Sequence, residues 1–313
     1  MILVVAGPTA SGKSELCCLL AKRLNTEIIS ADSMAVYRGM DIGTAKPVQC
    51  MKEIKHHLVD EVDPGVVFDA RMFEERALRA VEDLLRRKKI PLVCGGSYLY
   101  LQVLLYGIED TPPPDWKLRE RLYLIARRRG NLWLYQKLLV VDPLYAGKIS
   151  PNDLRRVVRA LEVFLQTGRP FSSFHRWSSP RFQCLCFYLK RSRSVLAERI
   201  AQRAQLMIQQ GLVEEVRRLM QMGLENFLTS QQAIGYKELI PYLKGEITLS
   251  DAVNNIIRNT LQYAKRQMRW FSKQGWIEVD MDALGTEGAL SFILEKLKEA
   301  GIYPDVSAHG SQG

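Results

Sequence analysis

Short, mainly apolar runs alternate with amphipathic segments along most of this chain. Each run is four to eight residues long, which suits a buried strand, and lacks helical spacing. The segments at 69–89, 193–222 and 289–300 instead repeat apolar residues every three or four positions, as helices do. This alternation predicts an α/β fold in which a parallel sheet is flanked by helices. The expected strands are residues 2–5, 27–30, 90–94, 183–190 and 276–279.

A long stretch without strand-like runs separates two of these strands. It begins after the proline-rich connector at 111–115, which is expected to be stiff and extended. Three helices are expected in it, over residues 116–129, 132–141 and 151–163. The predicted organisation is a discontinuous core of residues 1–111 and 179–300, an all-helical insertion of residues 112–178, and a flexible tail of residues 301–313.

Composition places the chain among soluble enzymes. Its 313 residues are 47% hydrophobic, enough for a large core, and no apolar run approaches the roughly 18 residues of a membrane-spanning helix. The first expected strand starts at residue 2 and leaves no room for a leader, so the cytoplasm is the expected location. The six cysteines lack metal-site spacing and are interpreted as small buried hydrophobic residues rather than ligands or disulfides.

The positive charge is concentrated in the expected insertion. The whole chain has a net charge of +10, and residues 112–178 contain 13 Lys and Arg against 5 Asp and Glu. Concentrating most of the excess charge in about one fifth of the chain favours a surface that binds a polyanion. Nucleic acid is the first candidate partner and membrane headgroups are the second.

A phosphate-binding motif follows the first strand. Residues 7–14 match G-x-x-x-x-G-K-[ST] between a buried strand and a helix, the context that this loop requires. Its backbone N–H groups would surround an anion, Lys13 would neutralise it, and Ser14 is placed to bind Mg²⁺ on it. The motif predicts a polyphosphate or pyrophosphate site without saying which molecule is bound. The binding residues are Gly7, Pro8, Thr9, Ala10, Ser11, Gly12, Lys13 and Ser14.

Polar residues after the second strand extend this candidate site. Asp32 is expected at the carboxyl edge of the sheet, as a Mg²⁺ ligand, a base or a helix N-cap. Residues 34–47 lack periodicity and are expected to form an ordered functional loop. His56 and His57 should point to opposite faces, which disfavours one shared metal ion. The strand at 90–94 does not end in an acidic residue, which disfavours a hydrolytic motor.

Eight motifs in order, between residues 7 and 267, resemble the bacterial tRNA dimethylallyltransferase (isopentenyl-tRNA transferase) family. The segments that match are residues 7–14, 32–33, 37–47, 56–58, 95–100, 159–163, 234–236 and 264–267. The resemblance implies a P-loop NTPase-like core with an inserted tRNA-binding domain. It also implies transfer of a dimethylallyl group from its diphosphate to N6 of the adenine 3′ of the anticodon, with Mg²⁺ as cofactor.

The resemblance also assigns residues. Asp32 is the expected general base, and Arg203 and Ser97 are expected to complete the diphosphate pocket. The anticodon stem-loop of tRNA is the expected partner, without a membrane or a second subunit. Residues carried over for tRNA contact are Asp32, Ser33, Met34, Ala35, Ser97, Arg119, Arg155, Arg156, Val157, Val158 and Arg159.

Four positions depart from the family pattern. Ser97 replaces a threonine and keeps the hydroxyl, whereas Ala35, Leu261 and Arg269 put any polar role at those positions in doubt. The C-terminal zinc-finger extension of eukaryotic relatives is missing, which favours the bacterial type. Two other classes stay open: a P-loop nucleoside or nucleotide kinase, which would turn over ATP, and a non-catalytic RNA-binding ATPase, which would not need Asp32 beside a closed pocket.

Overall fold

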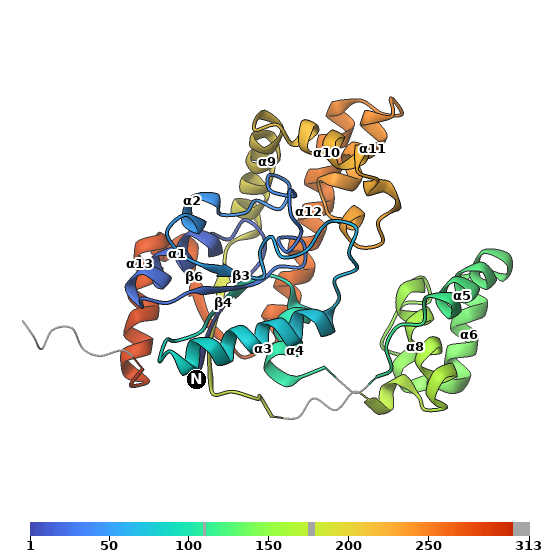
Figure 1. Cartoon of the computed structure of the whole chain (residues 1–313), viewed down its shortest axis with the longest axis horizontal. Helices are drawn as coiled ribbons and strands as arrows, with labels where there is room; N and C mark the ends of the chain where they lie inside the picture. The colour runs from blue at the N-terminus through green and yellow to red at the C-terminus, as the bar shows by residue number, and fades with distance from the viewer. Residues whose placement is uncertain (109–110, 175–178, 303–313) are drawn as a thin grey trace, which may run out of the picture. The chain divides into compact units, whose positions relative to one another are not determined.

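The computed structural model of the chain describes residues 1–108, 111–174 and 179–302. It contains two compact units, Met1–Leu105 with Pro180–Gly313, and Tyr106–Ser179 (Figure 1). We call the first the sheet unit and the second the helical unit. The helical unit begins six residues before the insertion expected from the sequence. The predicted flexible tail lies almost wholly outside the described residues.

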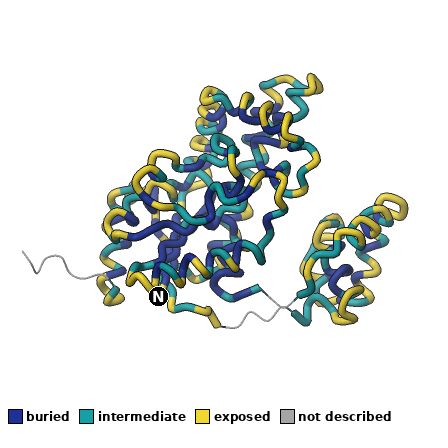
Figure 2. Tube along the Cα trace, in the orientation of Figure 1, coloured by how far each residue is buried: buried dark blue, intermediate teal, exposed yellow. Residues whose placement is uncertain are grey.

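A six-stranded parallel sheet organises the sheet unit. Its strand order is β3-β2-β4-β1-β5-β6, and every pair is parallel. The strands are β1 (Ile2–Ala6), β2 (Ile28–Ala31), β3 (His56–His57), β4 (Leu92–Gly95), β5 (Cys184–Lys190) and β6 (Ile277–Asp280). All residues of β1 and β2 are buried, as expected for strands covered on both faces (Figure 2). The predicted α/β class is confirmed, and β6 is the expected edge strand.

Helices cover both faces of this sheet. Helices α1 and α13 share a hydrophobic core with the strands. Helices α3 and α4 contact each other where the rings of Phe73 and Tyr100 stack. Helix α13 begins before the predicted residue 289: the Asp280 side chain caps its first turn, and a kink at Gly285, where φ is 63°, separates this turn from the rest of the helix. The helices are α1 (Lys13–Arg23), α2 (Val48–Met51), α3 (Ala70–Arg86), α4 (Tyr98–Tyr106), α9 (Arg193–Gln209), α10 (Leu212–Gln221), α11 (Tyr236–Leu243), α12 (Leu249–Phe271) and α13 (Met281–Glu299), with short 3-10 turns η2 (Leu224–Asn226) and η3 (Ser230–Gln232).

The helical unit has its own apolar core, visible as a dark interior in Figure 2. Its largest helices begin at aspartate or glycine caps and pack around Leu122, Leu138 and Leu161. Its elements are α5 (Trp116–Arg129), α6 (Asn131–Val141), α7 (Pro143–Ala146), α8 (Leu154–Thr167) and the 3-10 turn η1 (Phe171–Phe174). None of the helices in the described part of the chain has the length and apolar content needed to cross a membrane.

The cysteines correct one sequence-based interpretation. Cys18 on α1 and Cys50 on α2 form a disulfide, with their Cα atoms 6.1 Å apart. The spacing of cysteines along the chain could not reveal this pair, because 32 residues separate the two positions and the fold brings them together. The other four cysteines are free thiols, as expected.

Reducing this disulfide is expected to lower the melting temperature by about 5 to 10 °C, since releasing a loop of this length costs about 3 to 4 kcal/mol. Calorimetry with and without dithiothreitol measures the effect. A Cys50→Ser variant should melt at the same temperature in both buffers, and Cys184→Ser, which removes a free thiol, should behave like the parent. A parent protein that is insensitive to reductant would contradict the expectation.

Candidate functional site

Three loops leave the sheet at the same level and surround a cavity of about 540 Å³. Ala6, Ala31 and Gly95 are paired in register, so the segments that follow β1, β2 and β4 start side by side. This is the carboxyl edge, where α/β sheets bind their ligands. The predicted site residues that line the cavity are Thr9, Ala10, Gly12, Lys13, Ser14, Asp32, Ala35 and Arg203.

The loop at 7–14 forms one wall of the cavity. Helix α1 begins at Lys13, so its N-terminal end faces the cavity, as anion-binding loops require. Ala10 has a φ of 63°, a left-handed conformation that non-glycine residues rarely adopt and that functional loops often contain. Burial lowers the pKa of Lys13 to about 8, and its Nζ donates to the Pro8 carbonyl at 2.6 Å.

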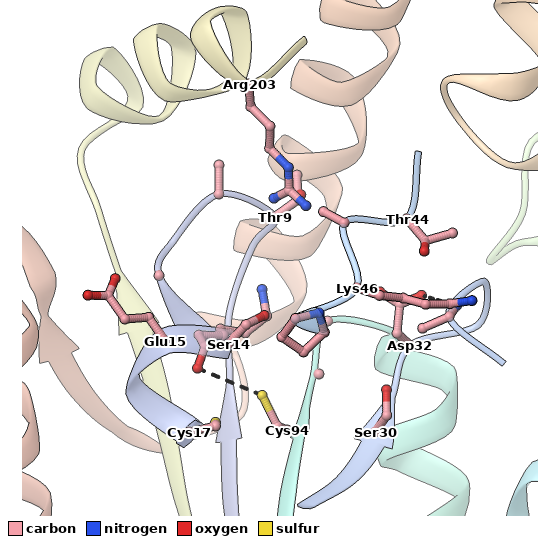
Figure 3. A pocket seen from close by; sticks show the side chains of 18 of the residues that line it. Thr9, Ser14, Glu15, Cys17, Ser30, Asp32, Thr44, Lys46, Cys94 and Arg203 are labelled. Atoms are coloured by element: carbon pink, nitrogen blue, oxygen red, sulfur yellow. Dashed lines mark hydrogen bonds between the residues drawn. The ribbon is translucent and has the colours of Figure 1, made fainter. Parts of the chain in front are cut away.

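Two arginines on α9 add positive charge to the same wall. Arg203 reaches from α9 toward Thr9 in Figure 3, and burial lowers its pKa. Arg199 lies one turn earlier, lines the cavity, and donates from Nε to the Ala10 carbonyl at 2.9 Å. Within the described residues neither Lys13 nor Arg203 forms a salt bridge, and the charge of Asp32 only partly offsets the lowering of both pKa values by burial. Half-buried cations without a bonded carboxylate suit an anionic ligand.

Asp32 forms the opposite side of the cavity (Figure 3). Its Oδ1 accepts hydrogen bonds from the N–H groups of Met34 at 2.8 Å and Ala35 at 3.3 Å. No helix begins here, so the structure excludes the helix N-cap that the sequence left open. These two hydrogen bonds, both accepted by Oδ1, fix the orientation of the carboxylate.

Ser97 supports this turn from behind. Its Oγ accepts a hydrogen bond from the Ser33 N–H at 3.0 Å, and it lies close enough to Tyr263 on α12 to affect the pKa of that phenol. Ser97, Ser33 and Met34 are not among the residues that line the cavity. A contact between Ser97 and a diphosphate therefore stays a prediction.

The expected functional loop at 34–47 is ordered by two buried charged residues. Glu215 accepts hydrogen bonds from the N–H groups of residues 41, 42 and 43 and from the Tyr236 hydroxyl. Lys46 binds the Tyr37 carbonyl together with Asp41 and Asp60. At Gly43 an added Cβ would lie 2.4 Å from the Tyr236 ring, which explains the glycine. The motifs at 37–47 and 234–236 therefore pack against each other.

The cavity offers oxygen ligands that fit Mg²⁺. Ser14 and Asp32 both line it, and a hydroxyl with a carboxylate and substrate phosphates is a usual Mg²⁺ environment. Strand β4 ends near Cys94 rather than an acidic residue. Among the described residues no group of His, Cys, Asp and Glu could by itself hold a metal ion. His57 bonds Glu27 whereas His56 lines the cavity, so the two histidines diverge as predicted.

The residues predicted to contact tRNA in the helical unit fall into two groups. Val157 and Val158 are 0% and 1% exposed and belong to its apolar core, so their side chains are not available to bind RNA. This corrects the prediction for both. Arg155 and Arg156 are exposed, and Arg156 forms a salt bridge with Asp153.

Arg119 and Arg159 are bound to a carboxylate inside the helical unit. Both form salt bridges with Glu162, which is 0% exposed. Arg159 also donates to the Pro112 carbonyl, and the Asp115 N–H donates to Glu162. These contacts attach the proline-rich connector to α5 and α8. The two arginines therefore have a structural role, since removing either would leave Glu162 undercompensated.

Sequence reasoning missed several residues of the cavity wall. Lys46, Arg199, Tyr263 and Gln267 all line it, and only Lys46, Arg199 and Gln267 lie in a motif or helix that the sequence had indicated. Tyr263 and Gln267 are four apart on α12 and so share a face of that helix. What that face contacts required the fold.

Comparisons with known proteins agree with this geometry. The family model described as IPP transferase matches residues 35–274. A tRNA dimethylallyltransferase of Aquifex aeolicus is 57% identical over 299 residues, 96% of this chain and 98% of that protein. The crystal structure of a Staphylococcus epidermidis tRNA isopentenylpyrophosphate transferase has a TM-score of 0.70 at 37% identity, covering 95% of this chain and 99% of its own. A eukaryotic dimethylallyltransferase acting on tRNA has a TM-score of 0.78 at 30% identity, covering 95% and 79%.

Proposed function

The chain belongs to the IPP transferase family, and on that premise we propose that it is a tRNA prenyltransferase. It transfers a dimethylallyl group from dimethylallyl diphosphate to N6 of adenine 37, 3′ of the anticodon, in tRNAs that read codons starting with U. The products are N6-isopentenyladenosine and diphosphate. The observation that carries the proposal is a single cavity with the half-buried cations Lys13 and Arg203 on one wall and Asp32 on the other.

The cationic wall serves the leaving group. The bond between the allylic carbon and the bridging phosphate oxygen breaks, and both electrons leave with diphosphate. Lys13, Arg203 and the loop N–H groups stabilise the charge that develops on that oxygen. Mg²⁺, bound by Ser14 and the diphosphate oxygens, would neutralise a further part of this charge when present.

The Asp32 wall serves the nucleophile. As the N6 lone pair forms the new C–N bond, the nitrogen becomes more acidic and must lose a proton, which Asp32 accepts as general base. The bonds from Met34 and Ala35 to Oδ1 keep the carboxylate pointed at the cavity. A base in the anticodon loop reaches this position only when it leaves its stack.

Exposed cations of the helical unit are proposed to bind the anticodon stem-loop. Arg127, Arg128 and Arg129 end α5, are all exposed, and have no salt bridge within the described residues. Arg129 also lies 5.1 Å from the ring centre of Trp133. These three side chains replace Arg119 and Arg159 as the best candidates for phosphate contact, because the latter two are bound to Glu162.

Changing all three residues of the 127–129 run to Gln is expected to weaken tRNA binding about 10- to 100-fold and to reduce the salt slope of log K by about 2 to 3. Filter binding at several salt concentrations measures both quantities. The control is Arg86→Gln with Lys88→Gln, which neutralises exposed cations at the end of α3 in the sheet unit. Equal losses in both variants would contradict an interface on α5.

Incubation with radiolabelled dimethylallyl diphosphate and unmodified tRNA, followed by digestion to nucleosides, tests the function itself. Label on adenosine supports the proposal. Turnover of ATP without label on tRNA would instead support a kinase or an RNA-binding ATPase. The proposed enzyme acts as a monomer in the cytoplasm.

A further inference from the structure

One buried amide joins the two halves of the cavity. Gln267 on α12 is 1% exposed, and its Oε1 accepts a hydrogen bond from the Thr9 N–H at 2.9 Å. Its Nε2 donates to the Gly96 carbonyl at 2.8 Å. Thr9 belongs to the phosphate-binding loop, and Gly96 follows β4. Both hydrogen-bonding atoms of the amide are therefore used, each on a different loop of the cavity.

The backbone at Gly96 is shaped around this side chain. A Cβ added at Gly96 would lie 2.4 Å from Gln267 Nε2 and 3.1 Å from the Gly7 carbonyl oxygen. A side chain at residue 96 would push the amide away from the loop. The glycine of the 95–100 motif and the glutamine of the 264–267 motif thus form one contact, although 171 residues separate them.

The same face of α12 also reaches the side of the cavity that contains Asp32. Tyr263, one turn before Gln267, lies close enough to Ser97 and Asp32 for both to affect the pKa of its phenol, and Ser97 accepts the Ser33 N–H beside Asp32. Helix α12 thus lies against Ser97, which holds the turn beside the general base, and against Thr9 of the phosphate-binding loop. The separation between the two reacting groups depends on this helix.

We propose that Gln267 is a positioning residue for the transfer reaction. Its amide fixes the phosphate-binding loop relative to the β4 turn and, through it, to Asp32, and so sets the distance between the allylic carbon and N6. This inference rests on the proposed function. Displacing bound reactants by about 1 Å can lower the rate of reaction about 100-fold without weakening their binding. Both polar atoms of the amide are bonded to the protein backbone, so the effect of Gln267 is expected on kcat rather than on KM.

Gln267→Leu removes both hydrogen bonds and is expected to lower the single-turnover rate of transfer about 100-fold. The KM for tRNA and the Kd for inorganic diphosphate, measured by calorimetry, are expected to change less than about threefold. Gln267→Glu keeps an acceptor for Thr9 and is expected to lose less. The matched control is Gln262→Leu, at an exposed position on the same helix.

A full rate for Gln267→Leu would overturn the proposal. So would a loss of diphosphate affinity with an unchanged single-turnover rate, since that places Gln267 in binding rather than positioning. Thermal melting will show whether the Leu variant folds. If it does not, the single-turnover rate and the diphosphate affinity are measured for Gln267→Glu, and the same two results would overturn the proposal. If the parent protein itself transfers no label to tRNA, the proposed function is wrong. Failure of the proposed function is therefore distinguishable from failure of the role proposed for Gln267.

Discussion

Replacing Asp32 by asparagine is expected to abolish detectable dimethylallyl transfer, with a fall of about 10³- to 10⁴-fold in the single-turnover rate. Asparagine retains the Oδ1 that accepts from Met34 and Ala35, so the turn should survive. What disappears is the group that takes the N6 proton. The rate with excess enzyme, measured by label incorporated into tRNA, isolates this step from product release.

The affinity for tRNA separates loss of the base from loss of the fold. For Asp32→Asn the Kd is expected to stay within about twofold of the parent, because a proton acceptor contributes to the transition state and little to ground-state binding. Asp63→Asn, which removes a carboxylate that is paired at the surface with Arg38, is the matched control and should transfer at the parental rate. Parental turnover by Asp32→Asn would remove Asp32 from the role of base.

The second large effect is expected at Lys13. Lys13→Met removes a half-buried cation from the diphosphate wall and should lower kcat/KM for dimethylallyl diphosphate about 10³-fold, as the loss of one preorganised charge beside a developing anion does. Lys22→Met neutralises an exposed lysine on the same helix and is expected to have no effect. Steady-state rates at saturating tRNA provide the comparison. A loss confined to the KM for tRNA would argue against the assigned role.

The same lysine predicts a dependence on pH. Burial lowers the pKa of Lys13 to about 8 in the free protein, and the charged form is the one that binds diphosphate. Below pH 8 the site is therefore charged, and as pH rises through 8 the value of kcat/KM for dimethylallyl diphosphate should fall tenfold per pH unit. In Lys13→Arg the guanidinium stays charged, so this inflection should vanish even though the lower activity of a bulkier cation remains. A parent profile that is flat from pH 7 to 10 would contradict the assignment.

In the helical insertion, matching a motif did not distinguish exposed residues from buried ones. Positions 155–159 were carried over as one block, yet the helix places Arg155 and Arg156 outside and Val157 and Val158 in the core. A linear match cannot separate these roles, because a helix turns successive residues through about 100°. From the sequence, Arg119 and Arg159 were predicted to contact RNA. In the structure both are bonded to the buried carboxylate of Glu162.

The sequence by itself determined whatever depends on neighbouring residues. Alternation of apolar runs and helical spacing predicted five of the six strands of the sheet and most of the helices, because local burial and backbone preferences decide these; the two-residue strand β3 was missed. The loop at 7–14 was recognisable because its chemistry lies within eight consecutive residues. Asp32 was placed at the carboxyl edge because it follows a strand directly.

Only the tertiary structure decided which distant residues meet. Gln267 bonds Thr9 across 258 positions, Glu215 orders the loop at residues 41–43 across more than 170, and Cys18 bonds Cys50 across 32. Each contact joins elements whose approach is fixed by the strand order and by the packing of helices on the sheet. Side-chain periodicity records whether a residue faces inward and contains nothing about its partner. The partner is set by the fold. For that reason the sequence could place Gln267 in a motif, and only the packing of α12 against the cavity showed which residues it bonds.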